Sequence, residues 1–418
     1  MGDRPLYYDG IMNNTHPRIA VIGAGPSGLA AAICAARAGA RVSLFEVRER
    51  VGDTIKVTGD GRCNIANAHT QASVYRNGDF VQRAFDACPP SLSLGFLESC
   101  GLLLRTEAQG RMYPLANKAT SVIDALRLAA ARAGVEAITG VGAAAVRPRT
   151  DGHGGWTAQM RDGSSTSFDA VIVCCGGNAP EGLLPLDVAS IPCTPVLGPL
   201  ATDTAAIHGL DKIRVKCALE CNGQRQVGEV TFRTYGISGI AAFDMSRIVQ
   251  PGDALFVDFL PDVARSASLV YLQFRLERLE PCSWGQFCCG MLLPLVSRAV
   301  LASAGLRPDD AAKSEALPAL DNALRAFLLV VSGIGDKRLC QVQRGGVDVR
   351  GVDALTLQLA NHPGLFVCGE ALDVDGPCGG YNLHWAWTSG ILAGCASAGI
   401  DVDGPCNVRS IASGECRA

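Results

Sequence analysis

The apolar positions at the start of the chain form two short runs separated by an Ala-rich stretch. Residues 19–22 are all apolar, which is typical of a strand covered on both faces of a sheet. The stretch from about Ser27 to Arg37 predicts a helix that ends at Gly39. Val42 to Phe45 then predict a second strand, which closes with Glu46. The pattern therefore predicts a βαβ unit.

Helical spacing and short apolar runs continue to about residue 190. They predict a helix from Thr120 to Ala133, with Asn117 or Thr120 as its cap. Further runs predict strands at 135–138, 142–146, 156–160 and 170–175. The last of these strands ends in Gly176 and Gly177. Because a glycine turn at the carboxyl end of a buried strand brings backbone close to a ligand, we expect Gly176 to line a binding site.

The pattern changes at about Pro192. Short strands separated by Gly and Asp turns, at 215–220, 228–233 and 254–259, predict a small antiparallel barrel. Helical spacing from 262 to about 329 predicts a helical insert in that barrel. The last segment returns to the opening pattern, with a buried strand that ends at Gly369 and a helix from about Asn382 to Ala398.

Three glycines give the first turn its chemistry. Gly23, Gly25 and Gly28 have the G-x-G-x-x-G spacing, in which the first permits a tight turn, the second lets a pyrophosphate approach, and the third lets helix and strand pack closely. Glu46, 18 residues after Gly28, stands where a carboxylate binds the ribose. A carboxylate there favours FAD or NAD over NADP. Residues 19–36 carry no charge, but a glycine turn and a second strand argue against a signal peptide or a membrane span.

A second acidic site near the end of the chain favours FAD over NAD. Glu370 and Asp373 follow the strand that ends at Gly369, and Gly379-Gly380 precede a helix. We expect the acidic groups to bind the ribityl or pyrophosphate side of the cofactor. The helix amides would stabilise negative charge on the N1 and O2 edge of the flavin. A single NAD site would not require this segment.

Two further segments are candidates for cofactor contacts. The loop at 55–69 carries Arg62, Cys63 and Asn64, whose side chains suit a polar ligand, although a surface turn with a buried cysteine explains the same residues. Ala143 begins a strand whose backbone we expect beside the adenine.

Composition removes several classes of function. The net charge of −3 gives no basic face for nucleic acid, and no run of like charges marks a tail. The 18 cysteines form no C-x-x-C pair, no secretory signal precedes them, and the six histidines form no zinc pattern. We therefore expect a cytoplasmic protein without nucleic-acid partner, membrane span, metal or obligate protein partner.

The chain resembles the BaiN-type family of FAD-dependent oxidoreductases, also described as aminoacetone oxidase-like or bile-acid 4,6-reductase-like. The resemblance covers about residues 17–399 and rests on GAGPSGLAAA, TGDGRCNIAN, QGRMYPLANKATSVIDAL, YGISGIAAFDMSR, QRGGVDV and CGEALDVDGPCGGYNLHWAWTSG. It implies an α/β fold with a glutathione-reductase-like FAD-binding Rossmann domain, an inserted β-barrel domain and a helical subdomain. The expected ranges are 17–190 and 345–418 for the FAD-binding domain and 191–344 for the barrel, with the helical insert at about 262–329.

The resemblance and the residue patterns together give one set of expected FAD contacts. These are Gly23, Ala24, Gly25, Pro26, Ser27, Gly28, Glu46, Arg62, Cys63, Asn64, Ala143, Gly176, Gly369, Glu370, Asp373, Gly380, Tyr381 and Asn382.

The expected activity is hydride transfer through the N5 atom of a non-covalently bound flavin. A fitting reaction is reduction of an activated C=C bond of a steroid-like or other enone substrate, with NADH or NADPH docking transiently as donor. His384 and Tyr381 are candidate proton donors, although Tyr381 could serve only to position the flavin and His384 only to pack or cap. Position 384 usually carries Gln in the resembling family. A flavin-dependent amine oxidase and a non-catalytic FAD-binding protein remain as alternatives.

Overall fold

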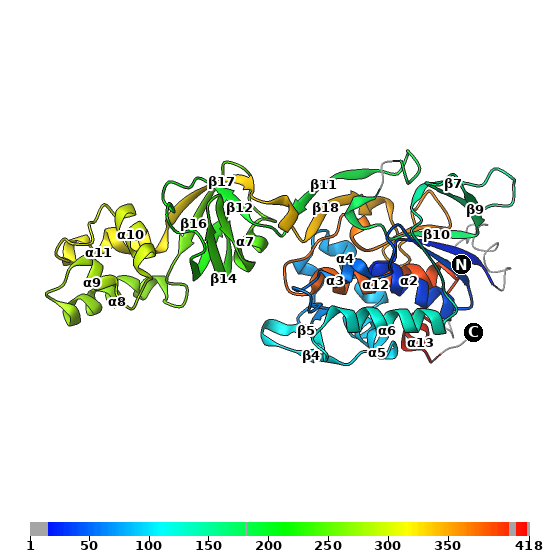
Figure 1. The fold of residues 1–418 in the computed structure, drawn as a ribbon, viewed down its shortest axis with the longest axis horizontal. Helices are drawn as coiled ribbons and strands as arrows, with labels where there is room; N and C mark the ends of the chain where they lie inside the picture. Colours follow the sequence, from blue (N-terminus) through cyan, green and yellow to red (C-terminus); the bar gives the residue numbers. More distant parts are fainter. Residues whose placement is uncertain (1–15, 180–181, 401–406, 416–418) are drawn as a thin grey trace. The chain divides into compact units, whose positions relative to one another are not determined.

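The computed structural model describes residues 16–179, 182–400 and 407–415. Contacts divide the chain into two compact units. Unit 1 holds residues 1–194 and 342–418, and unit 2 holds 195–341 (Figure 1). Unit 1 is therefore built from both ends of the chain.

A five-stranded parallel sheet forms the centre of unit 1. Its strand order is β19-β10-β1-β2-β6, from β1 (Arg18–Ile22), β2 (Arg41–Glu46), β6 (Glu136–Thr139), β10 (Ala170–Val173) and β19 (Leu365–Val367). The chain leaves β1 toward β2 on one side and returns to β10 on the other. The strand order changes direction at β1, and sheets of this kind bind nucleotides at such a point, beyond the carboxyl ends of the strands.

Two helices, α2 (Pro26–Arg37) and α12 (Tyr381–Ser397), pack against one another at unusually close range. A Cβ atom on Gly390 would lie 2.3 Å from the carbonyl oxygen of Ser27, and one on Gly394 would lie 2.4 Å from that of Ala31. Only glycine allows this approach. Since Gly390 meets Ser27 and Gly394 meets Ala31, the helices run in the same direction and their N-termini lie at the same end.

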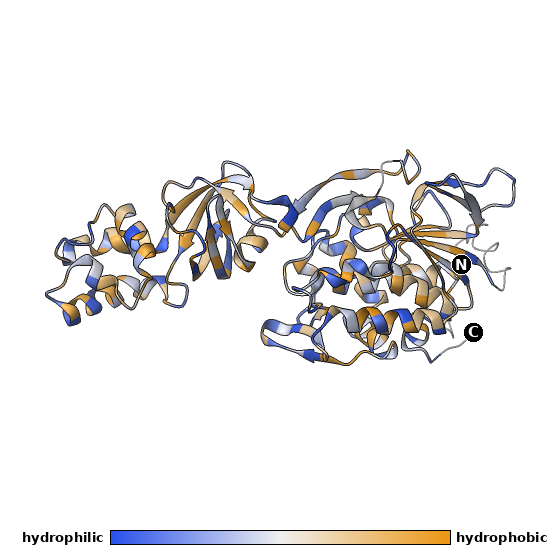
Figure 2. Cartoon of the chain, in the orientation of Figure 1, coloured by the Kyte–Doolittle hydropathy of each residue, from blue (hydrophilic) through white to orange (hydrophobic). Residues whose placement is uncertain are grey.

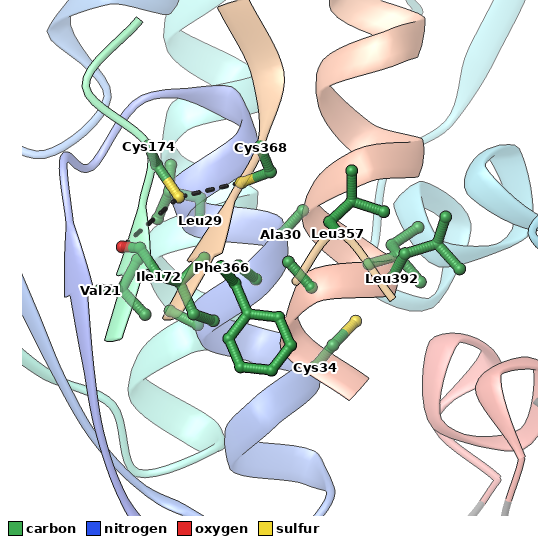
Figure 3. Close-up of a cluster of buried hydrophobic side chains, with 14 of the residues drawn as sticks. Val21, Leu29, Ala30, Cys34, Ile172, Cys174, Leu357, Phe366, Cys368 and Leu392 are labelled. Atoms are coloured by element: carbon green, nitrogen blue, oxygen red, sulfur yellow. Dashed lines mark hydrogen bonds between the residues drawn. The ribbon is translucent and has the colours of Figure 1, made fainter. Parts of the chain in front are cut away.

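The core between the sheet and these helices is mostly apolar. Figure 2 shows hydrophobic residues along the central strands and along α2 and α12. In Figure 3 the side chains of Cys174 and Cys368, which follow β10 and β19, point toward each other, with their Sγ atoms 3.0 Å apart. Burial raises the pKa of the Cys174 thiol well above its usual range. The described cysteines are free thiols.

Smaller elements surround the parallel sheet of unit 1. The strands β7, β8 and β9 form one antiparallel sheet and β3, β5 and β4 another. The bounds are β3 (Ala66–Asn67), β4 (Leu104–Thr106), β5 (Arg111–Pro114), β7 (Ala143–Pro148), β8 (Trp156–Met160), β9 (Ser165–Phe168), α3 (Asp53–Lys56), α4 (Gly78–Ala87), α5 (Pro90–Ser99), α6 (Ala119–Arg132) and α13 (Val408–Ser413).

The predicted cap of α6 is wrong. The helix begins after Lys118 without a side-chain cap, and the Asn117 side chain instead accepts a hydrogen bond from Arg62 Nε at 2.6 Å.

A two-stranded sheet of β11 (Ser190–Val196) and β18 (Val342–Val347) lies where the chain passes between the two units.

Unit 2 is a closed barrel with helices inserted between two of its strands. The barrel order is β12-β15-β14-β13-β16-β17, from β12 (Leu200–Thr202), β13 (Arg214–Cys221), β14 (Gln224–Arg233), β15 (Gly236–Ser238), β16 (Ala254–Asp258) and β17 (Phe327–Ile334). Helix α7 (Ile240–Met245) follows β15, and α8 (Arg265–Leu279), α9 (Trp284–Cys288), α10 (Pro294–Ser303) and α11 (Leu317–Arg325) lie between β16 and β17. The Rossmann-type sheet, the barrel and the helical insert confirm that part of the sequence-based fold. The glutathione-reductase-like assignment stays a prediction.

Candidate functional site

The three glycines of the first turn differ in what requires them. Gly23 has a φ of +103°, and a Cβ there would lie 2.5 Å from the carbonyl oxygen of Cys174. A Cβ on Gly28 would lie 1.8 Å from the carbonyl oxygen of Gly23. These two glycines are needed by the fold itself.

Gly25 is different, because nothing in the fold requires a glycine there. Its φ of −77° is open to any residue, and among the described residues the one neighbour within 4 Å of a Cβ would be Thr54 Oγ1 at 3.1 Å. A glycine in an unstrained conformation, close only to a side-chain atom that can move, fits a cradle for a ligand that approaches the backbone. The backbone of this turn therefore fits a pyrophosphate group.

The N-termini of α2 and α12 supply two anion sites. Neither helix has a side-chain cap or an acidic residue in its first turn, a pattern that favours an anion at the helix N-terminus. Tyr381 begins α12 nine residues before Gly390, which is level with Ser27 in the first turn of α2. At about 1.5 Å per residue, the two N-termini are offset by roughly 12 Å along parallel axes. This spacing suits an extended dinucleotide, with its pyrophosphate at α2 and a second negative group at α12.

Glu46 lies at the end of β2, beside the glycine turn. Its carboxylate accepts hydrogen bonds from the backbone N–H groups of Ala24 at 2.8 Å and Arg48 at 3.0 Å, and the side chain is buried. The backbone N–H of Val141 donates to the Glu46 carbonyl at 3.0 Å. This contact brings the start of β7, with the buried Ala143, to the same edge as Glu46 and Ala24.

We expect Glu46→Ala to weaken FAD binding by roughly ten- to a hundredfold, because a lost hydrogen bond to a charged group is worth about 1.5–3 kcal/mol. The substitution also removes the acceptor that fixes Ala24 N–H. The measurement is a flavin fluorescence titration of the apoprotein with FAD. An unchanged dissociation constant would contradict a ribose contact by Glu46.

Glu370 reaches the cradle from the other end of the chain. A Cβ on Gly369 would lie 2.5 Å from Ser27 Oγ, so the Gly369-Glu370 turn touches the first turn of α2. The Glu370 carboxylate accepts the N–H groups of Gln343, at 3.0 Å, and of Gly177, and burial raises its pKa. The predicted contacts Gly176 and Glu370 thus lie in adjoining turns beside Ser27.

The loop at 55–69 meets the turn before α12, more than 300 residues later in the chain. With its amide oriented to satisfy both ends, Asn64 accepts from Gly380 N–H and donates to Ala66 O, each at 3.2 Å. Asn67 Nδ2 donates to the Gly379 carbonyl at 2.8 Å. The two asparagines therefore fix the glycine turn, and through it the N-terminus of α12.

Four side chains predicted to contact FAD are engaged within the protein instead. Arg62 bonds Asn117 and Glu107 and stacks over the Tyr113 ring at 4.0 Å. Cys63 is fully buried, and its pKa is raised by burial to about 12. The Asn64 side chain fixes the Gly380 turn, and that of Asn382 bonds both the N–H and the carbonyl of Gly376. As side-chain ligands of FAD these residues are not supported. Their role in the structure is to shape the loop.

Asp373 also departs from its predicted role. The side chain is 1% exposed, and its carboxylate accepts hydrogen bonds from Arg76 Nε at 2.8 Å, Gly345 N–H at 3.1 Å and Asn77 Nδ2 at 3.2 Å. A carboxylate with its oxygens occupied in this way does not serve as a ribityl acceptor. The acidic residue of this segment that lies beside the cradle is Glu370.

His384 does not have the geometry of a proton donor. The ring is 1% exposed, with Nε2 3.2 Å from the Pro90 carbonyl and Nδ1 3.0 Å from Thr70 Oγ1. Because a carbonyl can only accept, Nε2 carries the hydrogen and donates it to Pro90. Burial lowers the pKa of His384 to about 4, so the ring stays neutral, and both of its nitrogens have partners within the protein.

His384 instead makes stability depend on pH. The pKa of histidine is about 6.5 in the unfolded chain and about 4 here, so the unfolded state binds the additional proton as the pH falls between these values. Stability is therefore lost below about pH 6.5. We expect His384→Gln to flatten the fall in urea midpoint between pH 6.5 and 4 while leaving the pH profile of activity unchanged. A changed activity profile would restore His384 as a catalytic candidate.

Tyr381 is the remaining candidate near the α12 N-terminus. It is the first residue of that helix and half-buried, and its carbonyl accepts a hydrogen bond from the Tyr75 hydroxyl at 2.8 Å.

Within the described residues, no group of three or more His, Cys, Asp or Glu side chains could hold a metal ion. None of the described helices is both long and apolar enough to cross a bilayer.

Sequence reasoning missed several residues that build this site. Ser389 Oγ accepts Gly369 N–H at 2.9 Å, and Gly390 and Gly394 let α12 approach α2. Arg76 and Arg344 bind the carboxylates of Asp373 and Asp375. The small residues of α12 could have predicted close packing against another helix. The Arg–Asp pairs could not be predicted, because their members lie far apart in the sequence.

The sequence is similar to known proteins over most of its length. Residues 17–396 match the family model described as the HI0933-like protein Rossmann domain. The chain is 32% identical over 410 residues to the 3-dehydro-bile acid delta(4,6)-reductase of Clostridium scindens, covering 91% of this chain and 99% of that protein. It is 26% identical over 393 residues to the ribosomal RNA dihydrouridine synthase of Escherichia coli, covering 88% and 95%.

Among solved structures, the open conformation of a flavocytochrome c3 fumarate reductase matches 93% of this chain and 80% of that chain, at 17% identity and a TM-score of 0.41. The family model and the C. scindens relative each span nearly all of the described sheet, turns and helices of the site. The chain belongs to the HI0933-like family.

Proposed function

We propose that the protein is a flavin oxidoreductase that binds FAD between the glycine turn and the N-terminus of α12. The observation that carries this proposal is the pair of uncapped parallel helix N-termini, offset by roughly 12 Å, with an unstrained glycine at the first. Glu46 would hold the adenosine ribose and Glu370 the ribityl chain. Non-covalent binding is consistent with this set of backbone amides and carboxylates.

FAD would supply hydride transfer through N5, and the protein would supply position and electrostatics. The amides of α12 would stabilise negative charge at the N1 and O2 edge, and Asn64 and Asn67 would keep them in place. Tyr381, at the first position of α12, would position the flavin or hold a proton at its hydroxyl for the substrate. A Tyr381→Phe variant separates these roles, since loss of a proton donor lowers kcat without loss of FAD.

We propose as substrate a carbon–carbon double bond conjugated to a carbonyl, as in a steroid-like or other enone, with NADH or NADPH as donor. The two relatives support this class, because a Δ(4,6)-reductase and a dihydrouridine synthase, by their names, both saturate such a bond. A small molecule is preferred over RNA because the net charge is −3 and identity to the bile-acid enzyme is higher.

An anaerobic spectrum tests this activity against its two alternatives. We expect NADH or NADPH to bleach the bound flavin and an enone to restore its colour. No bleaching with either donor, but rapid turnover of amines in air, would instead support a flavin-dependent amine oxidase. Neither response would support a non-catalytic FAD-binding protein.

A further inference from the structure

Two buried carboxylates lie within three residues of each other, just before the turn that leads into α12. Asp373 is 1% exposed and Asp375 is fully buried. Arg76 donates through Nε to both oxygens of Asp373 at 2.8 Å. Arg344 donates to Asp375 through Nε at 3.0 Å and Nη2 at 2.9 Å, the two-pronged arrangement that fixes a guanidinium in orientation.

Backbone contacts bring the two pairs together. Gly345, which follows Arg344, donates its N–H to Asp373 Oδ1 at 3.1 Å, and the N–H of Arg76 donates to the Asp375 carbonyl at 2.9 Å. Each arginine segment therefore contacts both aspartates or their backbone. We call these four residues the arginine cluster: Arg76, Arg344, Asp373 and Asp375.

The arginine cluster adjoins the proposed flavin end of the site. The residue before Arg76, Tyr75, bonds the carbonyl of Tyr381 at the start of α12. The residue after Asp375, Gly376, is clamped by the Asn382 side chain. Tyr75 and Gly376, which are next to Arg76 and Asp375 in the chain, therefore connect the arginine cluster to the first two residues of α12.

Stability alone does not explain this arrangement. A buried ion pair is often no more stable than apolar residues of the same volume, so two of them in one turn point to a need for positioned charge. The Arg76 side chain is 38% exposed, and within the described residues no protein acceptor takes the hydrogens of its two Nη groups. Arg344 is 21% exposed. The Nη donors of Arg76, whose guanidinium is oriented through Nε, suit an incoming anion, and Arg344 adds a second positive charge beside it.

We propose that Arg76, supported by the positive charge of Arg344, binds an anionic group, a carboxylate or a phosphate, carried by the molecule that is reduced. This inference rests on the proposed function for its location beside the flavin. Asp373 and Asp375 are positioning residues, since they orient the guanidinium groups and do not touch the substrate. The double bond would then lie at the flavin while the anion is held at the arginine cluster.

The test is calorimetric binding to the holoprotein without electron donor, so that it depends on neither turnover nor reduction. Two matched probe pairs are used: a 3-oxo-4,6-diene steroid carboxylic acid against its methyl ester, and uridine 5′-monophosphate against uridine. We expect the charged member of at least one pair to bind at least about tenfold more tightly than its neutral partner, as expected for a charge-assisted contact. The pair that shows this preference identifies the carboxylate or the phosphate.

Paired substitutions remove each guanidinium without leaving a carboxylate unpaired. In Arg76→Gln/Asp373→Asn and in Arg344→Gln/Asp375→Asn, we expect the preference for the charged probe to fall below about threefold. Arg76→Lys keeps a charge next to Asp373 but loses the Nη fork, and it should weaken binding of the charged probe by about fivefold or more even if the paired variants do not fold.

The inference is overturned if neither probe pair shows a preference for its charged member in the wild-type protein. It is also overturned if folded variants with normal FAD content keep that preference. Failure of the proposed function would appear separately, as absence of flavin bleaching by NADH and NADPH.

Discussion

Gly25→Val is expected to lose FAD while keeping its fold. The backbone at residue 25 has a φ of −77°, which valine adopts readily, and within the described part of the chain only Thr54 Oγ1, at 3.1 Å, would have to shift to make room for the new Cβ. The added methyl groups would enter the space that we propose for the pyrophosphate. If the clash between these methyl groups and the cofactor costs about 3 kcal/mol or more, FAD affinity falls by more than about a hundredfold. The measurement is an FAD titration followed by flavin fluorescence.

Two matched substitutions separate this effect from a general effect on the fold. Gly95→Val places the same side chain in α5, where nothing lies within 4 Å of a Cβ, and FAD affinity should be unchanged. Gly28→Val should fail to fold, because its Cβ would lie 1.8 Å from the Gly23 carbonyl oxygen. Full FAD affinity in Gly25→Val would show that the ligand does not approach the turn.

Asp373→Ala is expected to lower stability strongly. A polar residue in a turn usually contributes little to the fold, but this carboxylate is buried and accepts hydrogen bonds from Arg76, Asn77 and Gly345 N–H. Removing one partner of a buried ion pair costs about 3–5 kcal/mol, and the partial exposure of Arg76 places this pair near about 3 kcal/mol. Urea unfolding of the apoprotein measures the change without any contribution from FAD.

The control is an ion pair at the surface. Lys216 and Asp262 are 2.7 Å apart, with side chains 59% and 70% exposed, so Asp262→Ala should cost less than about 1 kcal/mol. If Asp373→Ala unfolds at the same urea concentration as the parent and loses only FAD, then Asp373 is a ligand of the cofactor after all.

The sequence predicted the parts of the site that depend on neighbours in the chain. The apolar runs give β1 and β2, and the spacing of Gly23, Gly25 and Gly28 gives the turn and the start of α2, because each depends on residues within one βαβ unit. The position of Glu46 at the end of β2 follows from the same local pattern.

The residues that it misassigned have partners far away in the chain. Asp373 resembles a ligand because it follows a strand and a glycine, yet its partner Arg76 lies 297 residues earlier. His384 was a candidate proton donor at a helix start, whereas its Nε2 faces Pro90 O, 294 residues away. Patterns within a segment report that a polar group is present. They do not report which distant group already satisfies it.

The most direct test of the central claim is the identity of the flavin held by the protein. Purified protein reconstituted with a mixture of FAD and FMN is freed of unbound flavin, denatured by heat, and the released cofactor is separated by chromatography. A site that begins at Gly25 and Glu46 and ends at the N-terminus of α12 requires the adenosine half of the cofactor, so FAD should be recovered at about one per chain. Recovery of FMN alone, or of no flavin, would contradict a single FAD site built from both ends of the chain.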